Sequence, residues 1–154
     1  RVNLKLTKSI VEKIKPKSDF IIANVHWGQE YQKTSNSLQR KLARELIDLG
    51  VDAIIGHHPH VVQEMEIYKN RPIFYSLGNF VFDQYFSEAT QQELGVGLVF
   101  RDKSISAYVF PLQSVKSQIS QMNYANAIKF TSDWTAKSRL GDNKFNNFNL
   151  KINF

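Results

Sequence analysis

The sequence contains no cysteine and no long apolar run. The absence of cysteine excludes disulfide bonds and thiolate chemistry, but it does not indicate a cellular compartment. No apolar segment approaches the ~20 residues needed to span a bilayer, and no secretory signal peptide is recognisable. Because the chain begins at Arg1 instead of Met, we expect a processed product or an excerpt. The chain itself is expected to be soluble, with any membrane association made through segments outside it.

The overall composition is that of a globular protein. The chain has 154 residues, 42% of them hydrophobic and 22% charged, which is enough for one domain with a buried core. Lys and Arg exceed Asp and Glu by 20 to 14, and the resulting net charge of +6 favours anionic partners such as phosphates, acidic polymers or anionic membranes. The basic residues are scattered and are not interleaved with aromatics, so no nucleic-acid partner is expected.

Residues 1–112 carry strong hydrophobic periodicity. Apolar residues at helical spacing predict a helix over residues 7–15 that stops before Pro16. Residues 19–25 and 51–55 are short apolar runs typical of buried strands, and four leucines on one face predict a helix over residues 35–49 between them. Buried strands that flank a helix predict a βαβ unit with parallel strands.

The pattern then changes to alternation. Residues 62–68 and 72–76 are predicted strands around a turn, and residues 94–100 and 105–110 are predicted to form a β-hairpin. Residues 113–154 are rich in Asn, Lys and Ser, with a short helix expected around Tyr124, Ile128 and Trp134. We therefore predict an α/β fold, in which a parallel βαβ unit is followed by a mixed or antiparallel hairpin region. Residues 1–112 would form the first unit and residues 113–154 a polar C-terminal extension.

All four histidines follow the two predicted parallel strands. His26 follows the first strand, and His57, His58 and His60 follow the second. Parallel strands joined by a helix end at the same edge of a sheet, about 4.8 Å apart, where open α/β sheets bind their ligands. A single histidine would more often be a hydrogen-bonded structural residue. Three within four residues, with a fourth at the matching strand end, predict a metal or phosphate site.

The local sequence separates the histidines into two groups. Pro59 favours an extended conformation at His58, and in extended chain residues two apart face the same side. We therefore predict His58 and His60, with His26, as metal ligands. His57 would face the other side, where it could contact substrate or donate a proton. Neutral imidazole suits several divalent metals, including Mn, Fe and Zn, so the sequence does not choose among them.

Three further residues are candidates for the same site. Glu30 could act as a ligand or a base, or could orient a histidine, but it could equally cap the next helix. Asn79 lies on a glycine-marked turn, where its amide could contact substrate or bond its own backbone. Trp27 is expected to be either a substrate-contacting pocket wall or a core residue.

Three motifs in order carry a resemblance to a known family. They are HWGQEY at residues 26–31, GHHPHV at residues 56–61 and YSLGNF at residues 75–80. With these motifs the region from residue 19 to residue 112 resembles the CapA-type proteins of poly-γ-glutamate capsule biosynthesis. That family is similar in fold to the calcineurin-like metallophosphoesterases, an α/β sandwich with two β-sheets and flanking helices.

The resemblance implies roles for the matched positions. His26 matches the histidine that follows a central strand in that superfamily, and His58 and His60 match its closing histidine pair. The Asp-containing and Asn-His motifs that supply the other ligands have no counterpart before Asp19. The chain therefore resembles the C-terminal half of such a domain, and its metal site is expected to be incomplete.

The resemblance implies a function in the synthesis or export of an anionic capsule polymer of the poly-γ-glutamate type at the cell envelope. A complete site would be a metal-dependent hydrolase of the phosphoesterase type, with His57 and Glu30 as catalytic residues and with Asn79 and Trp27 touching substrate. The expected partners are an anionic polymer or phosphoester and other capsule-synthesis subunits, with an N-terminal anchor outside this chain. The alternative is a non-catalytic scaffold or polymer-binding subunit that retains only part of the site.

Overall fold

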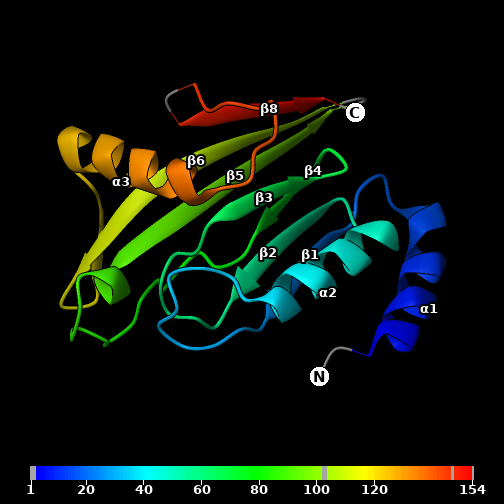
Figure 1. Ribbon diagram of the computed structural model, residues 1–154, viewed down its shortest axis with the longest axis horizontal. Coiled ribbons are helices and arrows are strands. Elements are labelled where there is room, and N and C mark those ends of the chain that lie inside the picture. Colours follow the sequence, from blue (N-terminus) through cyan, green and yellow to red (C-terminus); the bar gives the residue numbers. More distant parts are fainter. Residues whose placement is uncertain (1–2, 102–103, 147, 154) are drawn as a thin grey trace.

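Two four-stranded β-sheets pack face to face in the computed structural model, which describes residues 3–101, 104–146 and 148–153 (Figure 1). The first sheet has the order β1-β2-β4-β3, and the second has the order β5-β6-β7, with β8 also paired to β6. The strands are β1 (Ile22–His26), β2 (Ala53–His57), β3 (Met65–Tyr68), β4 (Arg71–Phe74), β5 (Gln92–Arg101), β6 (Ser104–Val115), β7 (Gln118–Gln121) and β8 (Asn149–Asn153). The α/β fold class is therefore confirmed.

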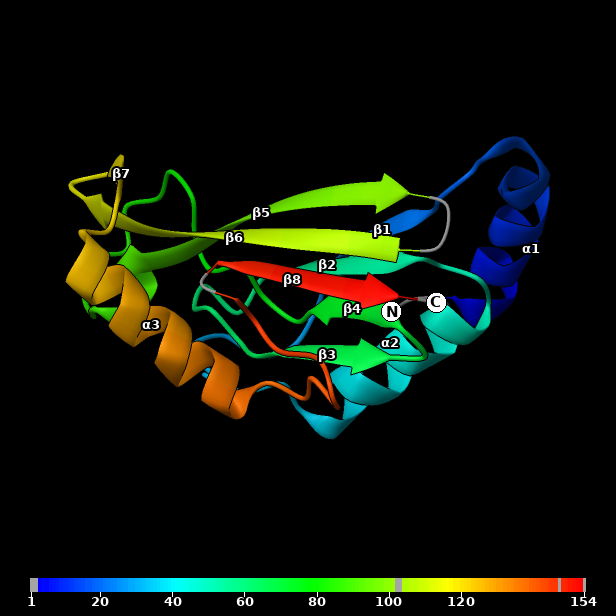
Figure 2. The ribbon, with the colours of Figure 1, turned by 90° about the horizontal axis from the view of Figure 1, so that it is seen from above.

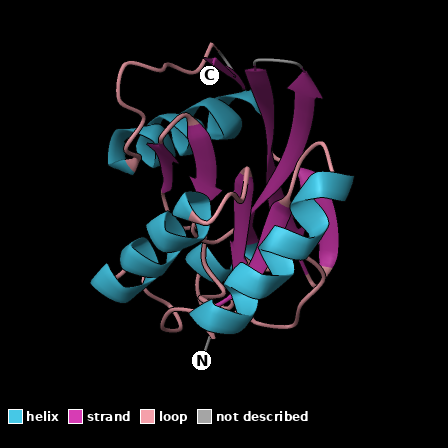
Figure 3. Cartoon of the chain, turned by 90° about the vertical axis from the view of Figure 1, so that its right-hand side faces the viewer, coloured by secondary structure: helices cyan, strands magenta, loops and turns pink. Residues whose placement is uncertain are grey.

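The α-helices lie in different places around the two sheets (Figure 2). The helices are α1 (Leu4–Ile14), α2 (Ser37–Asp48), α3 (Tyr124–Lys137) and the short 3-10 helices η1 (Lys15–Lys17) and η2 (Ala89–Gln91). Helix α2 is packed against the first sheet, whereas α3 lies at one end of the molecule and α1 at the other (Figure 2). Figure 3 shows the same arrangement from the end at which α1 lies.

The first sheet separates two hydrophobic cores. Ile54 and Ile73 belong to a core shared with α1 and α2, which we call the helix-side core. Ile55 and Phe74, the next residues along the same strands, face the second sheet in what we call the inter-sheet core. Because successive side chains of a strand point to opposite faces, both faces of these strands are apolar, and the strands therefore appear as continuous apolar runs.

The predicted βαβ unit is confirmed. Strands β1 and β2 are parallel, and α2 connects them along the chain. A capping box begins α2, in which the Asn36 side chain accepts from the Gln39 backbone while the Gln39 side chain accepts from the Asn36 backbone. Strands β3 and β4 form a hairpin whose two turn residues, Lys69 and Asn70, have positive φ values of 48° and 57°.

The second sheet extends beyond the predicted hairpin. Strands β5 and β6 pair from Gln92↔Gln113 to Arg101↔Ser104, and both are longer than the sequence predicts. The predicted boundary at residue 112 falls inside β6. The helix expected around residues 124–134 is present as α3, and its Trp134 is buried in the inter-sheet core. The described residues after 112 thus complete the second sheet, while their separation from residues 1–112 as a unit stays a prediction.

Candidate metal centre

The parallel register brings the histidine-bearing strand ends together. His26 is the last residue of β1 and His57 the last of β2, and they are direct partners in the ladder. Beyond the strands the two loops remain joined, because the Trp27 amide donates to the His57 carbonyl at 3.1 Å and the Tyr31 amide to the Pro59 carbonyl at 2.7 Å. The predicted common edge for the histidines is thus present in the structure.

The expected extended backbone at His58 is wrong. His58 has a φ of 100° and His60 a φ of 60°, so both lie in the left-handed region. Pro59 does disfavour the right-handed helical conformation at His58, but it leaves positive φ available, and histidine enters this region more often than most residues. The loop turns sharply, held by the hydrogen bond from Tyr31, and the His58 and His60 rings still lie 5.9 Å apart between centroids.

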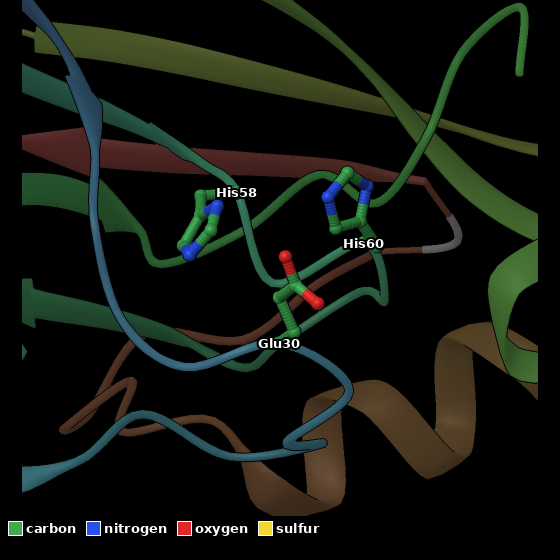
Figure 4. A group of neighbouring side chains, drawn as sticks. All are labelled: Glu30, His58 and His60. Carbon is green, nitrogen blue, oxygen red and sulfur yellow. The ribbon is translucent and has the colours of Figure 1, made fainter.

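Three side chains converge beyond the strand ends. One side-chain atom of each of Glu30, His58 and His60 could serve as a metal ligand, and these three atoms all lie within 4.8 Å of one another. Figure 4 shows the Glu30 carboxylate directed toward the space between the two rings. Two imidazoles and one carboxylate are a donor set that suits Zn, Mn or Fe, and three protein ligands leave coordination positions open for water or substrate. We call these residues the Glu30 cluster.

His26 lies beside the Glu30 cluster without belonging to it. Its ring lies against that of His58, with centroids 4.5 Å apart. Of the candidate residues, the structure therefore groups Glu30 with His58 and His60 and leaves His26 as a neighbour. The role of His26 as a ligand stays a prediction.

Asn79 fixes the orientation of the His60 ring. The Asn79 Nδ2 donates to the Thr90 carbonyl at 3.0 Å, so its Oδ1 is the atom that lies 2.8 Å from His60 Nδ1. An amide oxygen can only accept, so neutral His60 must carry its proton on Nδ1. Its Nε2 lone pair is then available for a metal. Asn79 is buried, and in the structure its amide contacts protein groups, whereas the sequence predicts contact with substrate.

His57 is favoured in its neutral form. Burial lowers the pKa of His57, and the charge of His26 lowers it further. The lowered pKa favours the uncharged imidazole, which can accept a proton, over the imidazolium that the predicted role of proton donor would use. His57 lies outside the Glu30 cluster, and its catalytic role stays a prediction.

Trp27 is packed beneath the strand ends. It is 8% exposed, its Nε1 donates to the Tyr75 carbonyl at 2.8 Å, and its ring stacks on that of Tyr75. A Cβ at Gly56 would lie 2.1 Å from the Tyr75 carbonyl oxygen and 2.6 Å from Trp27 Nε1, so only glycine fits there. The one side-chain hydrogen-bond donor of Trp27 is already used by the Tyr75 carbonyl. The packing therefore gives no support to the predicted contact of Trp27 with substrate.

An aromatic rim lies beside the Glu30 cluster, and the part of it that Phe82 and Phe86 contribute was missed at the level of sequence. The Phe82 and Tyr31 rings lie 5.2 Å and 6.0 Å from the His60 ring, and Phe86 meets Tyr31 edge-on at 5.1 Å. Gln84 ties this rim together, because its Nε2 donates to the Tyr31 hydroxyl at 3.0 Å. The signal was available, since four aromatic residues within residues 80–86 are unusual for a loop that follows a strand.

The fold and the strand-end histidines together define a class of protein. It is an α/β protein of two packed sheets with histidines at the ends of parallel strands, as in metallophosphoesterase-like proteins. Within the described residues, no helix has the length and apolarity needed to cross a membrane.

Comparison with known proteins gives the family. The family described as bacterial capsule synthesis protein PGA_cap matches residues 2–84, more than half of the chain, and the chain belongs to this family. The capsule biosynthesis protein CapA of Bacillus anthracis is 36% identical over 156 residues, which cover 96% of this chain and 38% of that protein. The PGA biosynthesis protein CapA of Bacillus subtilis is 46% identical over 85 residues, covering 55% of this chain and 22% of that protein.

A more distant relative is similar over three quarters of the chain. A probable polyglutamine synthesis accessory protein of Mycobacterium tuberculosis is 28% identical over 120 residues, covering 75% of this chain and 31% of that protein. The chain thus spans well under half the length of these relatives.

Proposed function

We propose that this protein acts in the synthesis or export of an anionic capsule polymer of the poly-γ-glutamate type, through a divalent metal held by the Glu30 cluster. The observation that carries the proposal is the convergence of Glu30, His58 and His60 within 4.8 Å. Membership of the capsule synthesis family and the names of its relatives supply the polymer. The proposed location is the cell envelope, with other capsule-synthesis subunits as partners.

A bound divalent metal would activate water and stabilise negative charge on the group under attack. Asn79 holds the His60 ring so that its Nε2 faces away from the Asn79 amide. Phe82 and Tyr31 border the same ring. His57, neutral because of its burial, would accept a proton near the strand ends.

A second candidate function is a non-catalytic scaffold or polymer-binding subunit. Among the described residues the Glu30 cluster has three ligand-type side chains, whereas a two-metal site of the phosphoesterase type needs more. That observation favours the second candidate for the chain taken alone. The presence of bound metal and of turnover separates the two.

The first experiment measures bound metal by elemental analysis of the purified chain after loading with Mn²⁺, Fe²⁺ or Zn²⁺. We expect His58→Ala and His60→Ala to lose the metal, because each removes one of three ligands. His57→Ala is the matched control, since it removes a neighbouring imidazole outside the Glu30 cluster. Equal metal content in all four proteins would rule out the proposed site.

The second experiment replaces the gene in capsule-forming cells with the His58→Ala/His60→Ala double variant and measures polymer-derived glutamate. A loss of capsule supports the metal-dependent function, and turnover of generic phosphoesters with added Mn²⁺ would identify the chemistry. A normal capsule with the metal-free variant would support the scaffold instead. A normal capsule after deletion of the whole gene would exclude a role in capsule formation.

A further inference from the structure

A cavity of about 600 Å³ lies between α3, η2 and the paired ends of β5 and β6. This volume is in the usual range for sites that bind small ligands. No member of the Glu30 cluster lines it, but the cavity uses the same two chain segments. Lys33 lies three residues after Glu30, and Val61 directly follows His60. We call this space the α3 cavity.

The walls of the α3 cavity combine amide groups with an apolar floor. Four carboxamide side chains line it: Gln91, Gln92, Gln113 and Asn126. A carboxamide has both a donor and an acceptor, which is the pair that a secondary amide needs. Gln91 and Gln92 already donate to protein groups, so these two side chains offer mainly their acceptor oxygens. Val62, Phe130 and Trp134 extend the inter-sheet core into the floor, where methylene groups can pack.

A buried hydroxyl adds an independent sign of a ligand. Ser114 lines the α3 cavity and is 4% exposed, and its Oγ has no hydrogen-bond partner among the described residues. A buried hydroxyl without a partner is costly, because it has lost its hydrogen bonds to water. A polar ligand group that reached Ser114 Oγ from the cavity would satisfy it.

The charges around the α3 cavity leave two lysines available. Lys129 pairs with Asp133 at 2.6 Å, and the buried Glu64 pairs with Arg139 at 3.0 Å. Lys33 and Lys137 line the same space and form no ion pair with a described residue. The remaining acid, Glu88, accepts a hydrogen bond from Gln92 at 2.9 Å.

We infer that the α3 cavity binds a short stretch of a carboxylate-bearing polyamide, that is, a glutamyl chain. Each unit of such a chain carries a secondary amide, methylene groups and a carboxylate, which match the carboxamides, the apolar floor and the two available lysines. This inference rests on the proposed function for the identity of the polymer. The inference adds a location to the proposed function: the protein binds the polymer in the α3 cavity, which is separate from the Glu30 cluster.

The test is binding of short γ-linked glutamate oligomers to the 154-residue chain, measured by calorimetry and by NMR shift mapping without added metal. We expect shifts in α3 and at the start of β5, and about a tenfold loss of affinity in Lys137→Gln from one lost charge-assisted hydrogen bond. Lys33→Gln should behave in the same way. Lys41→Gln is the matched control, because it removes the same charge from an exposed position on α2 and should change affinity less than about twofold.

Three outcomes would overturn the inference. An equal effect of Lys137→Gln and Lys41→Gln would show binding to the general positive field of the protein. Equal affinity for neutral glutamine oligomers would remove the carboxylate from the ligand, and would point to a peptide segment of a partner protein. Absence of binding would remove the site. Each of these results leaves the capsule function itself to the gene-replacement experiment, which does not depend on the α3 cavity.

Discussion

The two cores on either side of the first sheet are built alike but serve different parts of the molecule. Each contains one tryptophan whose Nε1 donates to a backbone carbonyl of the first sheet or its loops at 2.8 Å, from Trp27 to Tyr75 and from Trp134 to Gln63. Trp27 directly follows His26 and packs beneath the strand ends. Trp134 lines the α3 cavity instead. The helix-side core therefore supports the candidate metal centre, and the inter-sheet core supports the cavity.

Replacing each tryptophan in turn should have the largest effect, and it tests whether each core supports a different site. Trp27→Ala and Trp134→Ala should each lower the free energy of unfolding by about 3–5 kcal/mol, because both delete a large buried side chain. Only Trp27→Ala should also weaken metal binding, whereas Trp134→Ala should leave it unchanged. Chemical denaturation and metal titration measure the two effects, with Trp→Phe variants used where an Ala variant does not fold. Metal affinity that falls equally in both would show that the two cores do not act separately.

The buried carboxylates also differ between the two sheets. Glu64, just before β3, pairs with Arg139 at 3.0 Å, and Glu66, within β3, pairs with Arg44 at 2.7 Å. Glu93, on β5, is 1% exposed, and neither of its carboxylate oxygens has a hydrogen-bond partner among the described residues. Burial raises the pKa of Glu93 from its usual 4.5 to about 7. The first sheet thus buries ion pairs, and the second buries a carboxyl group that is favoured in its neutral form.

Glu93 should make stability depend on pH. The folded protein keeps this proton up to about pH 7, whereas the unfolded chain releases it near pH 4.5. Stability is therefore lost as pH rises through this window, and the loss reaches about 3 kcal/mol above it. Glu93→Gln should remove most of that loss, so the variant should be more stable than the parent at pH 8 and nearly equal to it at pH 4.5. Denaturation curves at the two pH values check this, and an equal shift at both would refute the burial explanation.

The sequence predicts those parts of the candidate metal centre that depend on chain periodicity. Apolar runs around a leucine-faced helix place His26 and His57 at one sheet edge, and the register confirms it. The positive φ values of His58 and His60 were not predictable from local preference, because contacts with the loop after β1 impose them. The contact of Asn79 with His60 spans 19 residues and depends on how two loops pack. Local patterns therefore locate this site, whereas tertiary contacts orient its side chains.

Asn79 gives a direct test of that orientation. Asn79→Ala should weaken metal binding by about 10- to 100-fold, because the His60 ring loses the acceptor that selects its tautomer. Asn126→Ala is the matched control, since it removes a carboxamide that lines the α3 cavity and should leave metal affinity unchanged. Metal titration followed by calorimetry measures both. An unchanged affinity in Asn79→Ala would mean that the ring is held by Phe82 and Tyr31 alone.

The smallest effect is expected in helix α1. This helix also shows that hydrophobic periodicity does not by itself predict which residues are buried. Leu6, Ile10, Val11 and Ile14 share the spacing that predicts an apolar face, yet only Val11 is buried, at 3% exposed against 57% for Leu6. Leu6→Gln should change the free energy of unfolding by less than about 0.5 kcal/mol, since most of the side chain is already in water. Val11→Ala should cost about 1.6 kcal/mol, from two buried carbons at about 0.8 kcal/mol each. Thermal and chemical denaturation of the two variants compare them directly. A cost for Leu6→Gln as large as that for Val11→Ala would show that the outer face of α1 is buried in the folded protein. The helix-side core would then extend to that face of α1.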